Sequence, residues 1–181
     1  MNLWHDIPMG ESSEEFNVII EIPKESHNKY EIDKETGLIK LDRVNYGSAP
    51  YPFDYGFVPQ TLWEDGDALD VVVLTTYPLQ VGIMLAVRPV AVMEMIDAGE
   101  SDYKIIAVPV KDKRWDNVKD LADVNEHTLK EYRNFFETYK QLKGGSPEKS
   151  KVEIKNIMGK KEAVAAVERS VELYRAKFGK K

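Results

Sequence analysis

The segment 64–71, Glu-Asp-Gly-Asp-Ala-Leu-Asp-Val, most strongly constrains how this chain can fold. Asp65, Asp67 and Asp70 fall within six residues, directly before the apolar run 71–74, which has the composition of a buried strand. In an extended chain Asp65 and Asp67 would share one face of the strand and Asp70 would lie on the other. Gly66, however, permits a turn that can bring the three carboxylates together. Carboxylates concentrated in this way favour a hard cation such as Mg²⁺, which takes oxygen ligands.

Two other interpretations of this segment have to be weighed. Asp-Gly-Asp is a common surface turn, so the segment taken alone is also open to a purely structural role. The EF-hand calcium loop is excluded, because its sixth position, counted from Asp65, is Asp70 instead of glycine, and its twelfth is Thr76 instead of glutamate. The segment is therefore either a turn or a metal site of a different kind.

Composition narrows the class of protein. The 181 residues suit a single domain over 1–181, and a net charge of −6 argues against general nucleic-acid binding. The absence of cysteine excludes disulfides, a thiolate nucleophile and a cysteine zinc site, and the three separated histidines form no His-Glu-x-x-His motif. Because the sequence has no long apolar run and its first residues lack the pattern of a secretion signal, we expect a cytoplasmic protein with no membrane partner.

Hydrophobic periodicity predicts strands first and helices last. Alternating or continuous apolar patterns predict strands at 17–22, 29–32, 38–43, 71–74, 82–95 with a bend at Pro89, 103–110 and, briefly, 151–154. Apolar residues three and four apart predict helices at 127–143 and 160–178, the second with a buried stripe of Val164, Val167, Val171, Tyr174 and Phe178. This order predicts an α+β domain with a small closed or partly open β-barrel.

Charged side chains recur where the predicted strands begin or end. Lys29 and Glu31 share a face, and an antiparallel hairpin between the first two strands would bring Glu21 near them. Arg43 is in phase with two apolar residues, which is typical of an arginine that meets a fixed anion. The alternatives are a solvated charge pair for Lys29 and Glu31 and, for Arg43, a side chain that reaches past the strand end to solvent.

Further candidates lie around two turns and in one stiff segment. Segment 49–59 holds three prolines and four aromatic residues; its rings are expected in the core, with the Tyr55 hydroxyl free for an oxyanion. The remaining candidates are Asp97, Asp102 and Lys104, which flank the 97–102 turn, and Tyr139 and Lys140, which end the first predicted helix. The structural alternatives are a polar hairpin turn for the first three, a core tyrosine for Tyr139 and a solvated lysine for Lys140. Carboxylates bind divalent metals, whereas lysine, arginine and tyrosine bind phosphate oxygens, so the set predicts a site for a metal complex of a phosphate anhydride.

Several short motifs, in this order and spacing, give the chain a specific resemblance. They are Glu21-Ile22-Pro23, Lys29-Tyr30-Glu31, Asp42-Arg43, Tyr51-Pro52-x-x-Tyr55-Gly56, Asp65-Gly66-Asp67-x-x-Asp70-Val71, Asp97 to Asp102 with Lys104, and Phe135-Phe136-x-x-Tyr139-Lys140. The chain resembles the soluble family I inorganic pyrophosphatases from residue 18 to the second helix. That resemblance implies a five-stranded OB-like barrel with additional strands and two C-terminal helices, hydrolysis of pyrophosphate to two phosphates with Mg²⁺, and a homohexamer.

The resemblance also implies a role for each candidate residue. Asp67 is expected to act as the general base. The expected metal ligands are Asp65, Asp70, Asp102 and Asp97, with Glu21 and Glu31 acting through water. The expected phosphate-binding residues are Lys29, Arg43, Tyr55, Lys104, Tyr139 and Lys140. The chain departs from the family pattern at two positions. Ala68 puts the stiffness of the acidic loop in doubt, and Ala98 puts in doubt how tightly the metal nearest Asp97 is bound.

Two rival functions remain open at this stage. A non-enzymatic OB-fold that binds nucleic acid would need a basic groove with exposed aromatic rings, whereas the predicted mouth carries at least as many acids as bases. A nucleotide phosphohydrolase would share the metal chemistry, but the sequence contains no Gly-x-x-x-x-Gly-Lys loop.

Overall fold

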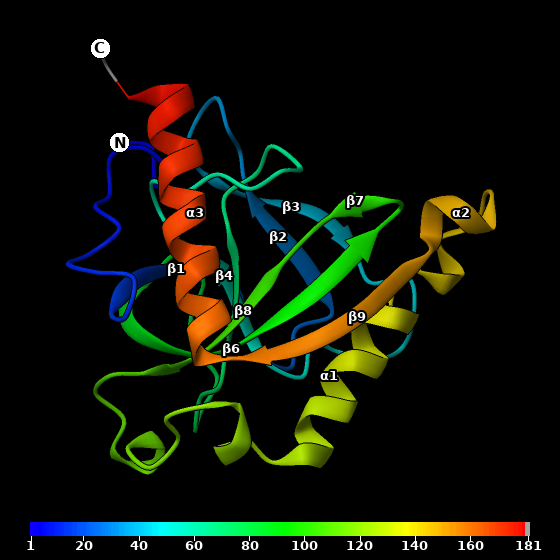
Figure 1. Cartoon of the computed structure of the whole chain (residues 1–181). Coiled ribbons are helices and arrows are strands. Elements are labelled where there is room, and N and C mark those ends of the chain that lie inside the picture. The colour runs from blue at the N-terminus through cyan, green and yellow to red at the C-terminus, as the bar shows by residue number, and fades with distance from the viewer. Residues whose placement is uncertain (180–181) are drawn as a thin grey trace.

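Five strands of the computed structural model close into a ring. The strands are β1 (Phe16–Ile22), β4 (Asp54–Phe57), β5 (Asp70–Val73), β8 (Lys104–Pro109) and β6 (Met84–Asp97), paired in that order. The long strand β6 pairs with both β8 and β1 and so closes the ring, while β5 and β8 form its parallel pair (Figure 1). The predicted α+β class with a five-stranded OB-like barrel and two C-terminal helices is confirmed. The structure describes residues 1–179, with only the backbone at 147 and 149.

The remaining elements surround this barrel. They are the hairpin β2 (Asn28–Ile32) and β3 (Ile39–Val44), β7 (Glu100–Ser101), β9 (Val152–Gly159), α1 (Glu126–Thr138), α2 (Pro147–Ser150) and α3 (Lys160–Phe178), with short 3-10 turns at Lys113–Trp115, Leu121–Asp123 and Gln141–Lys143. Strand β9 extends the sheet beyond β6, and α1 and α3 lie at different faces of the body (Figure 1). Among residues 1–179, no helix combines the length and the apolar character needed to cross a membrane.

Alternation along the strands sends neighbouring side chains to two different cores. On β5, Val71 and Val73 belong to the core that includes Val167 of α3, whereas Val72 belongs to the core that includes Phe136 of α1. Strand β5 is therefore buried on both sides, which explains its continuous apolar run. All four rings of segment 49–59 are buried, as predicted: Tyr51, Phe53 and Tyr55 lie in the α1 core, and Phe57 lies in a separate cluster with Trp4. Phe53 stacks on Phe136 with ring centroids 5.2 Å apart.

Three local predictions were wrong. Strand β2 pairs with β3 and not with β1, although Glu21 still reaches the hairpin because its carboxylate accepts a hydrogen bond of 2.6 Å from the Ile32 backbone N–H. Helix α1 ends at Thr138, before Tyr139, and β9 is twice as long as the predicted 151–154. Leu41 on β3 is 55% exposed, because the two-stranded hairpin has no layer over this part of its surface.

Helix α3 has its predicted bounds but a different buried face. The buried residues are Ala163, Ala166, Val167 and Ser170, so only one residue of the predicted stripe is fully covered. Small side chains let a helix axis approach the sheet closely, which here brings the Ser170 carbonyl within 2.9 Å of the Leu62 backbone N–H. The hydrophobic pattern predicted that the larger apolar residues of α3 would be buried. The helix instead packs close to the sheet, and this close packing buries the smaller residues.

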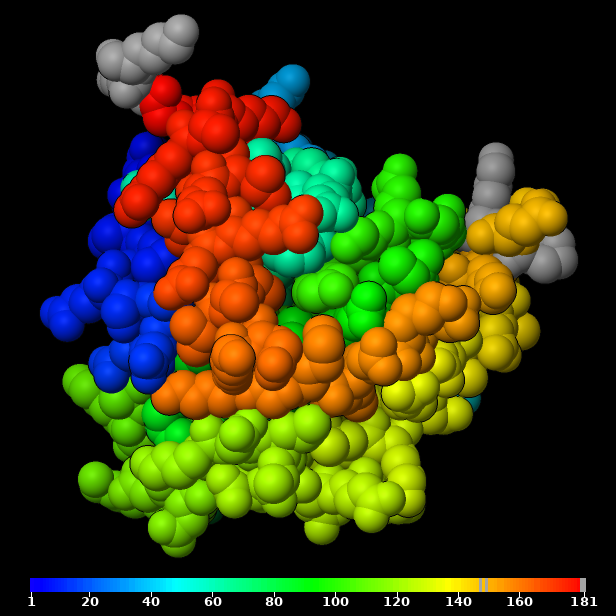
Figure 2. Space-filling view, viewed as in Figure 1, coloured from blue at the N-terminus to red at the C-terminus, as the bar shows by residue number. Residues whose placement is uncertain are grey.

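The first 15 residues form an arm that lies against the body beside α3 (Figure 2). Trp4 anchors this arm: its side chain is buried and its indole N–H donates to the Thr61 carbonyl at 2.7 Å. The backbone N–H of Gln60 in turn donates to the Trp4 carbonyl at 2.8 Å. The arm is therefore attached to the segment that leads into the acidic loop.

Gly56 should be required for the contact between β1 and β4. A Cβ atom at this position would lie 1.9 Å from the Ile19 carbonyl oxygen, so Gly56→Ala forces the two strands apart. We expect the free energy of unfolding, measured with urea, to fall by about 3 kcal/mol or more. Gly47→Ala is the matched control, because nothing lies within 4 Å of its added Cβ; equal stability of the two variants would contradict the close approach.

Candidate active site

A cavity of about 450 Å³ opens at the mouth of the barrel, between the β2–β3 hairpin, the acidic loop and the β6–β7 turn. Its acidic lining residues are Glu21, Glu31, Asp65, Asp67, Asp70, Asp97, Glu100 and Asp102, and its basic ones are Lys29, Lys34, Lys104, Lys140 and Lys143. Carboxylates thus outnumber cations around the cavity. Such a surface is electrostatically unfavourable unless cations bind to it.

The parallel pairing of β5 with β8 forms the centre of the site. It places Asp70 directly opposite Lys104, and the Lys104 ammonium lies 2.5 Å from the Asp70 carboxylate. The same ammonium pairs with Asp102, two residues before it. Lys104 is 3% exposed, so two carboxylates offset the cost of removing its charge from water.

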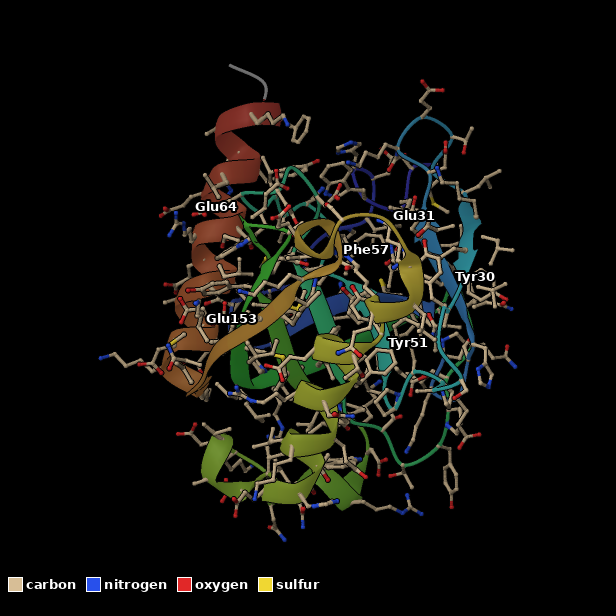
Figure 3. All side chains as sticks on the ribbon, turned by 90° about the vertical axis from the view of Figure 1, so that its right-hand side faces the viewer. Tyr30, Glu31, Tyr51, Phe57, Glu64 and Glu153 are labelled. Atoms are coloured by element: carbon tan, nitrogen blue, oxygen red, sulfur yellow. The ribbon has the colours of Figure 1, made fainter. Side chains whose placement is uncertain are left out.

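The acidic loop is held from both ends. Gly66 takes φ +88°, which lets the Asp67 backbone N–H donate to the Asp65 carboxylate at 3.0 Å. At the start of the loop, the side chain of Glu64 lies beside α3, where it pairs with Arg169 (Figure 3). The glycine turn therefore joins Asp65 to Asp67, and both line the same cavity as Asp70, but the three carboxylates do not converge on one point as the sequence had suggested.

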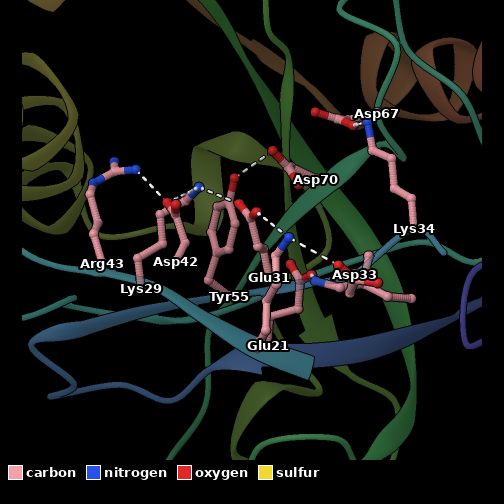
Figure 4. A network of polar contacts seen from close by, with 12 residues as sticks. Glu21, Lys29, Glu31, Asp33, Lys34, Asp42, Arg43, Tyr55, Asp67 and Asp70 are labelled. Carbon is pink, nitrogen blue, oxygen red and sulfur yellow. Dashed lines mark hydrogen bonds and ion pairs between the residues drawn. The ribbon is translucent and has the colours of Figure 1, made fainter. Parts of the chain in front are cut away.

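The β2–β3 hairpin contributes a chain of alternating charges. Lys29 pairs with Glu31 at 3.2 Å and with Asp42 at 3.1 Å, and Asp42 also accepts from Arg43 at 2.6 Å (Figure 4). Arg43 and Lys29 are register partners across the hairpin, which brings the two cations to a shared carboxylate. On the other side of the cavity Lys140 pairs with Asp97.

Twelve of the thirteen residues proposed from sequence line this one cavity. The exception is Arg43, which lies beside the cavity and reaches it indirectly, with its guanidinium 6.0 Å from the ring centroid of Tyr139. The expectation of a free Tyr55 hydroxyl was wrong: Tyr55 is buried, and its hydroxyl donates to Asp70 at 2.5 Å. Tyr139 and Lys140 take part from the segment that follows α1.

Sequence reasoning missed several members of the site. Asp42 was quoted in a motif, yet its role as the shared partner of Lys29 and Arg43 was not recognised. Lys34, Glu100 and Lys143 also line the cavity. Lys34 lies in a turn, Glu100 opens the two-residue strand β7, and Lys143 ends a 3-10 turn. None of these elements is long enough to show a strand or helix period, so spacing did not identify the three residues.

Burial and neighbouring charges shift the pKa values of several side chains that line the cavity. Burial, assisted by Asp70, raises the pKa of Glu21 to about 8. Burial also raises the pKa values of Asp65, Tyr55 and Tyr139. Burial alone would lower the pKa of Lys104, but Asp102 and Asp70 outweigh it and keep this pKa above its usual range.

The donor set suits a divalent cation, although no three acidic or histidine side chains among the described residues are already arranged around one point. Lys104 occupies one oxygen each of Asp70 and Asp102, and the described contacts leave their second oxygens without a protein partner. Oδ1 of Asp97 and Nε of Arg43 are buried and unpartnered in this part of the chain. Buried polar atoms without partners mark positions where a ligand completes the hydrogen bonding.

Fold and site together define a class of protein: an OB-like barrel whose mouth can hold a polyphosphate anion together with hard cations. Known proteins agree with this class. The family model for inorganic pyrophosphatase matches residues 18–175. Soluble inorganic pyrophosphatase 1 of Arabidopsis thaliana is 44% identical over 172 residues, which cover 94% of this chain and 79% of the relative.

Solved structures give the same result. The inorganic pyrophosphatase of Thermus thermophilus has a TM-score of 0.91 and 42% identity, covering 97% of this chain and 99% of that one. The Helicobacter pylori enzyme has a TM-score of 0.87 and 40% identity, covering 94% and 99%. This chain belongs to the inorganic pyrophosphatase family, so the predicted family and the predicted enzyme class, a diphosphatase hydrolase, are confirmed.

Glu21 should make the stability of the metal-free protein depend on pH. Its pKa rises from 4.5 to about 8 on folding, so between these values the folded protein binds a proton that the unfolded chain has released. The free energy of unfolding therefore falls as pH rises from 5 to 8, by about 1.4 kcal/mol at most per pH unit. In EDTA, Glu21→Gln should show a flatter pH dependence of urea unfolding; parallel curves for variant and parent would contradict the shift.

Proposed function

We propose that this chain hydrolyses inorganic pyrophosphate to two phosphates in the cavity at the barrel mouth, with Mg²⁺ as its cofactor and Asp67 as its general base. The observation that carries this proposal is the gathering of eight carboxylates and five lysines around one cavity in a member of this family. The main difficulty in this reaction is the charge of the substrate, because water has to attack a strongly anionic phosphate anhydride.

The carboxylates divide by their position in the cavity. Asp65, Asp70 and Asp102 would hold the metal at the centre, where Asp70 and Asp102 are the partners of Lys104. Asp97 would hold a metal that arrives with the substrate, and its buried, unpartnered Oδ1 supports this role. Glu21 and Glu31 would act at longer range through water. When bound, the divalent ions offset phosphate charge and acidify the attacking water.

Asp67 differs from the other acids in its surroundings. Its side chain is 55% exposed, whereas that of Asp102 is 14% exposed. An accessible carboxylate at the rim can accept a proton from water and release it to solvent, which suits the general base. Carboxylates buried around Lys104 are better placed to hold metal than to exchange protons.

Cations and phenols would hold the two phosphoryl groups. Lys29, Arg43 and Lys140 each pair with a carboxylate that is partly exposed, so an incoming phosphate can compete for their charge. Tyr139 and Lys104 are more deeply placed, and their pKa values are raised, so they would enter the reaction as hydrogen-bond donors. The pKa of Tyr55 is raised too, but its one O–H proton is given to Asp70, so Tyr55 would donate to a phosphate only once Asp70 has bound a metal. Neutralising charge on the leaving phosphate is the contribution expected of this group.

The remaining expectations are carried forward as proposals. We propose that the chain acts as one domain, in the cytoplasm, as a homohexamer, and without nucleic acid or membrane. Relatives whose names call them soluble inorganic pyrophosphatases support the location.

Phosphate release should distinguish this function from its rivals. With Mg²⁺ present, we expect rapid phosphate release from pyrophosphate, much slower release from ATP, and loss of activity in excess EDTA. Equal or faster release from ATP would identify a nucleotide phosphohydrolase instead. A salt-sensitive gel shift with single-stranded DNA, without any phosphate release, would identify a nucleic-acid-binding module.

Asp67→Asn should separate proton transfer from metal binding. The amide cannot take the proton, so turnover should fall by about 10² or more, while Mg²⁺ binding measured by calorimetry stays close to that of the parent. Asp116→Asn, a surface carboxylate paired with Lys113, is the control and should keep full activity. Turnover at the parent rate in Asp67→Asn would rule out the base assignment.

A further inference from the structure

Lys34 lies at the rim of the cavity and has no role in the mechanism described above. It follows β2 in the turn that joins the two strands of the hairpin, and its ammonium pairs with Oδ1 of Asp67 on the opposite wall (Figure 4). Among the side chains that the structure describes, Lys34 is the sole ion-pair partner of Asp67, and Asp67 is the sole one of Lys34. The proposed base is thus held from across the cavity by one side chain.

The backbone of Lys34 is fixed by its own turn and by the N-terminal arm. Asp33 closes the turn by accepting hydrogen bonds from the Thr36 backbone N–H at 2.9 Å and its hydroxyl at 2.8 Å. The Asn2 side chain donates to the Lys34 carbonyl at 3.3 Å. Arm and turn also pack tightly, because a Cβ atom on Gly37 would lie 2.7 Å from the Asn2 Cα.

The side chain of Lys34 is placed by Trp4. Its ammonium lies 5.9 Å from the centroid of the Trp4 ring, within the range of a cation–π interaction. Trp4 is buried in the same apolar cluster as Ala68, the residue after Asp67. One arm residue therefore lies against the lysine of the hairpin and shares an apolar cluster with the loop that carries the aspartate.

We propose that Lys34 is a positioning residue for the Asp67 carboxylate, set in place by Trp4 of the N-terminal arm. The inference rests on the proposed function, because it takes Asp67 as the base. Exposed ion pairs contribute little to stability, and Lys34 and Asp67 are 57% and 55% exposed, so fold stability does not account for the contact. Holding a reacting carboxylate in one orientation does affect the rate, since small displacements of a catalytic group are costly.

The test compares Lys34→Met, Lys34→Arg and a matched control. Lys34→Met should lower kcat about tenfold and leave KM within about twofold, because orientation of the base is lost while substrate binding is kept. Lys34→Arg should recover most of the turnover, since it keeps the charge and its reach. Lys111→Met removes an exposed lysine that makes no ion pair in the described part of the chain, and it should behave like the parent.

A double variant shows whether Lys34 acts through Asp67. When Asp67→Asn is already present, adding Lys34→Met should cause no further loss of kcat, because the carboxylate to be positioned is gone. Multiplying losses, or a raised KM at unchanged kcat, would assign Lys34 to substrate binding and overturn the proposal. The urea midpoint of Lys34→Met should equal that of the parent, and a lowered midpoint accompanied by lost activity would indicate a structural role instead.

The outcomes also separate this inference from the proposed function. Parent turnover in Asp67→Asn would overturn the base assignment, and the role of Lys34 with it. Parent turnover in Lys34→Met beside an impaired Asp67→Asn would overturn the role of Lys34 alone. Failure of Lys34→Arg to exceed Lys34→Met would likewise count against positioning by charge.

Discussion

The ion pairs of Lys104 with Asp70 and Asp102 are the interaction on which the rest of the site depends. A buried ammonium requires carboxylate partners, and buried carboxylates require a cation; removing one partner from such a group costs about 3–5 kcal/mol. The parallel register of β5 and β8 provides the cation together with a carboxylate partner, because it places Asp70 opposite Lys104. The barrel can therefore keep an acidic cluster at its mouth before any metal binds, and the second oxygens of these carboxylates remain available to one.

Charge around the cavity is arranged as pairs that a substrate complex can exchange. Lys29, Arg43 and Lys140 each face a carboxylate across the surface of the site. A phosphate group that entered with a metal would offer these cations an anion and would offer the released carboxylates a cation. The cavity is acidic as a whole, so it would favour a substrate that arrives already associated with divalent ions.

Much of this could be predicted from sequence because strands carry a strict period. Apolar patterns located four of the five barrel strands, and Gly66 indicated the turn in the acidic loop. The fifth strand, β4, lies in segment 49–59, which was predicted only as a stiff segment with its rings in the core. The failures lie where the period gives no information. Pairing partners are set by topology, so β2 was assigned to the wrong neighbour, and turn residues such as Lys34 have no regular face. Tyr55 was expected to be free because its own strand does not reveal that the Asp70 carboxylate of the neighbouring strand lies within reach of its hydroxyl.

The small buried face of α3 has a consequence for how the site comes into being. Ala166 and Ser170 let this helix approach closely enough for the Ser170 carbonyl to bind the segment before the acidic loop, and Arg169 pairs with Glu64 within it. During translation that loop leaves the ribosome long before α3 is made. A nascent chain can thus expose every acidic group of the site while the loop still lacks its support, so the loop gains that support only when α3 docks.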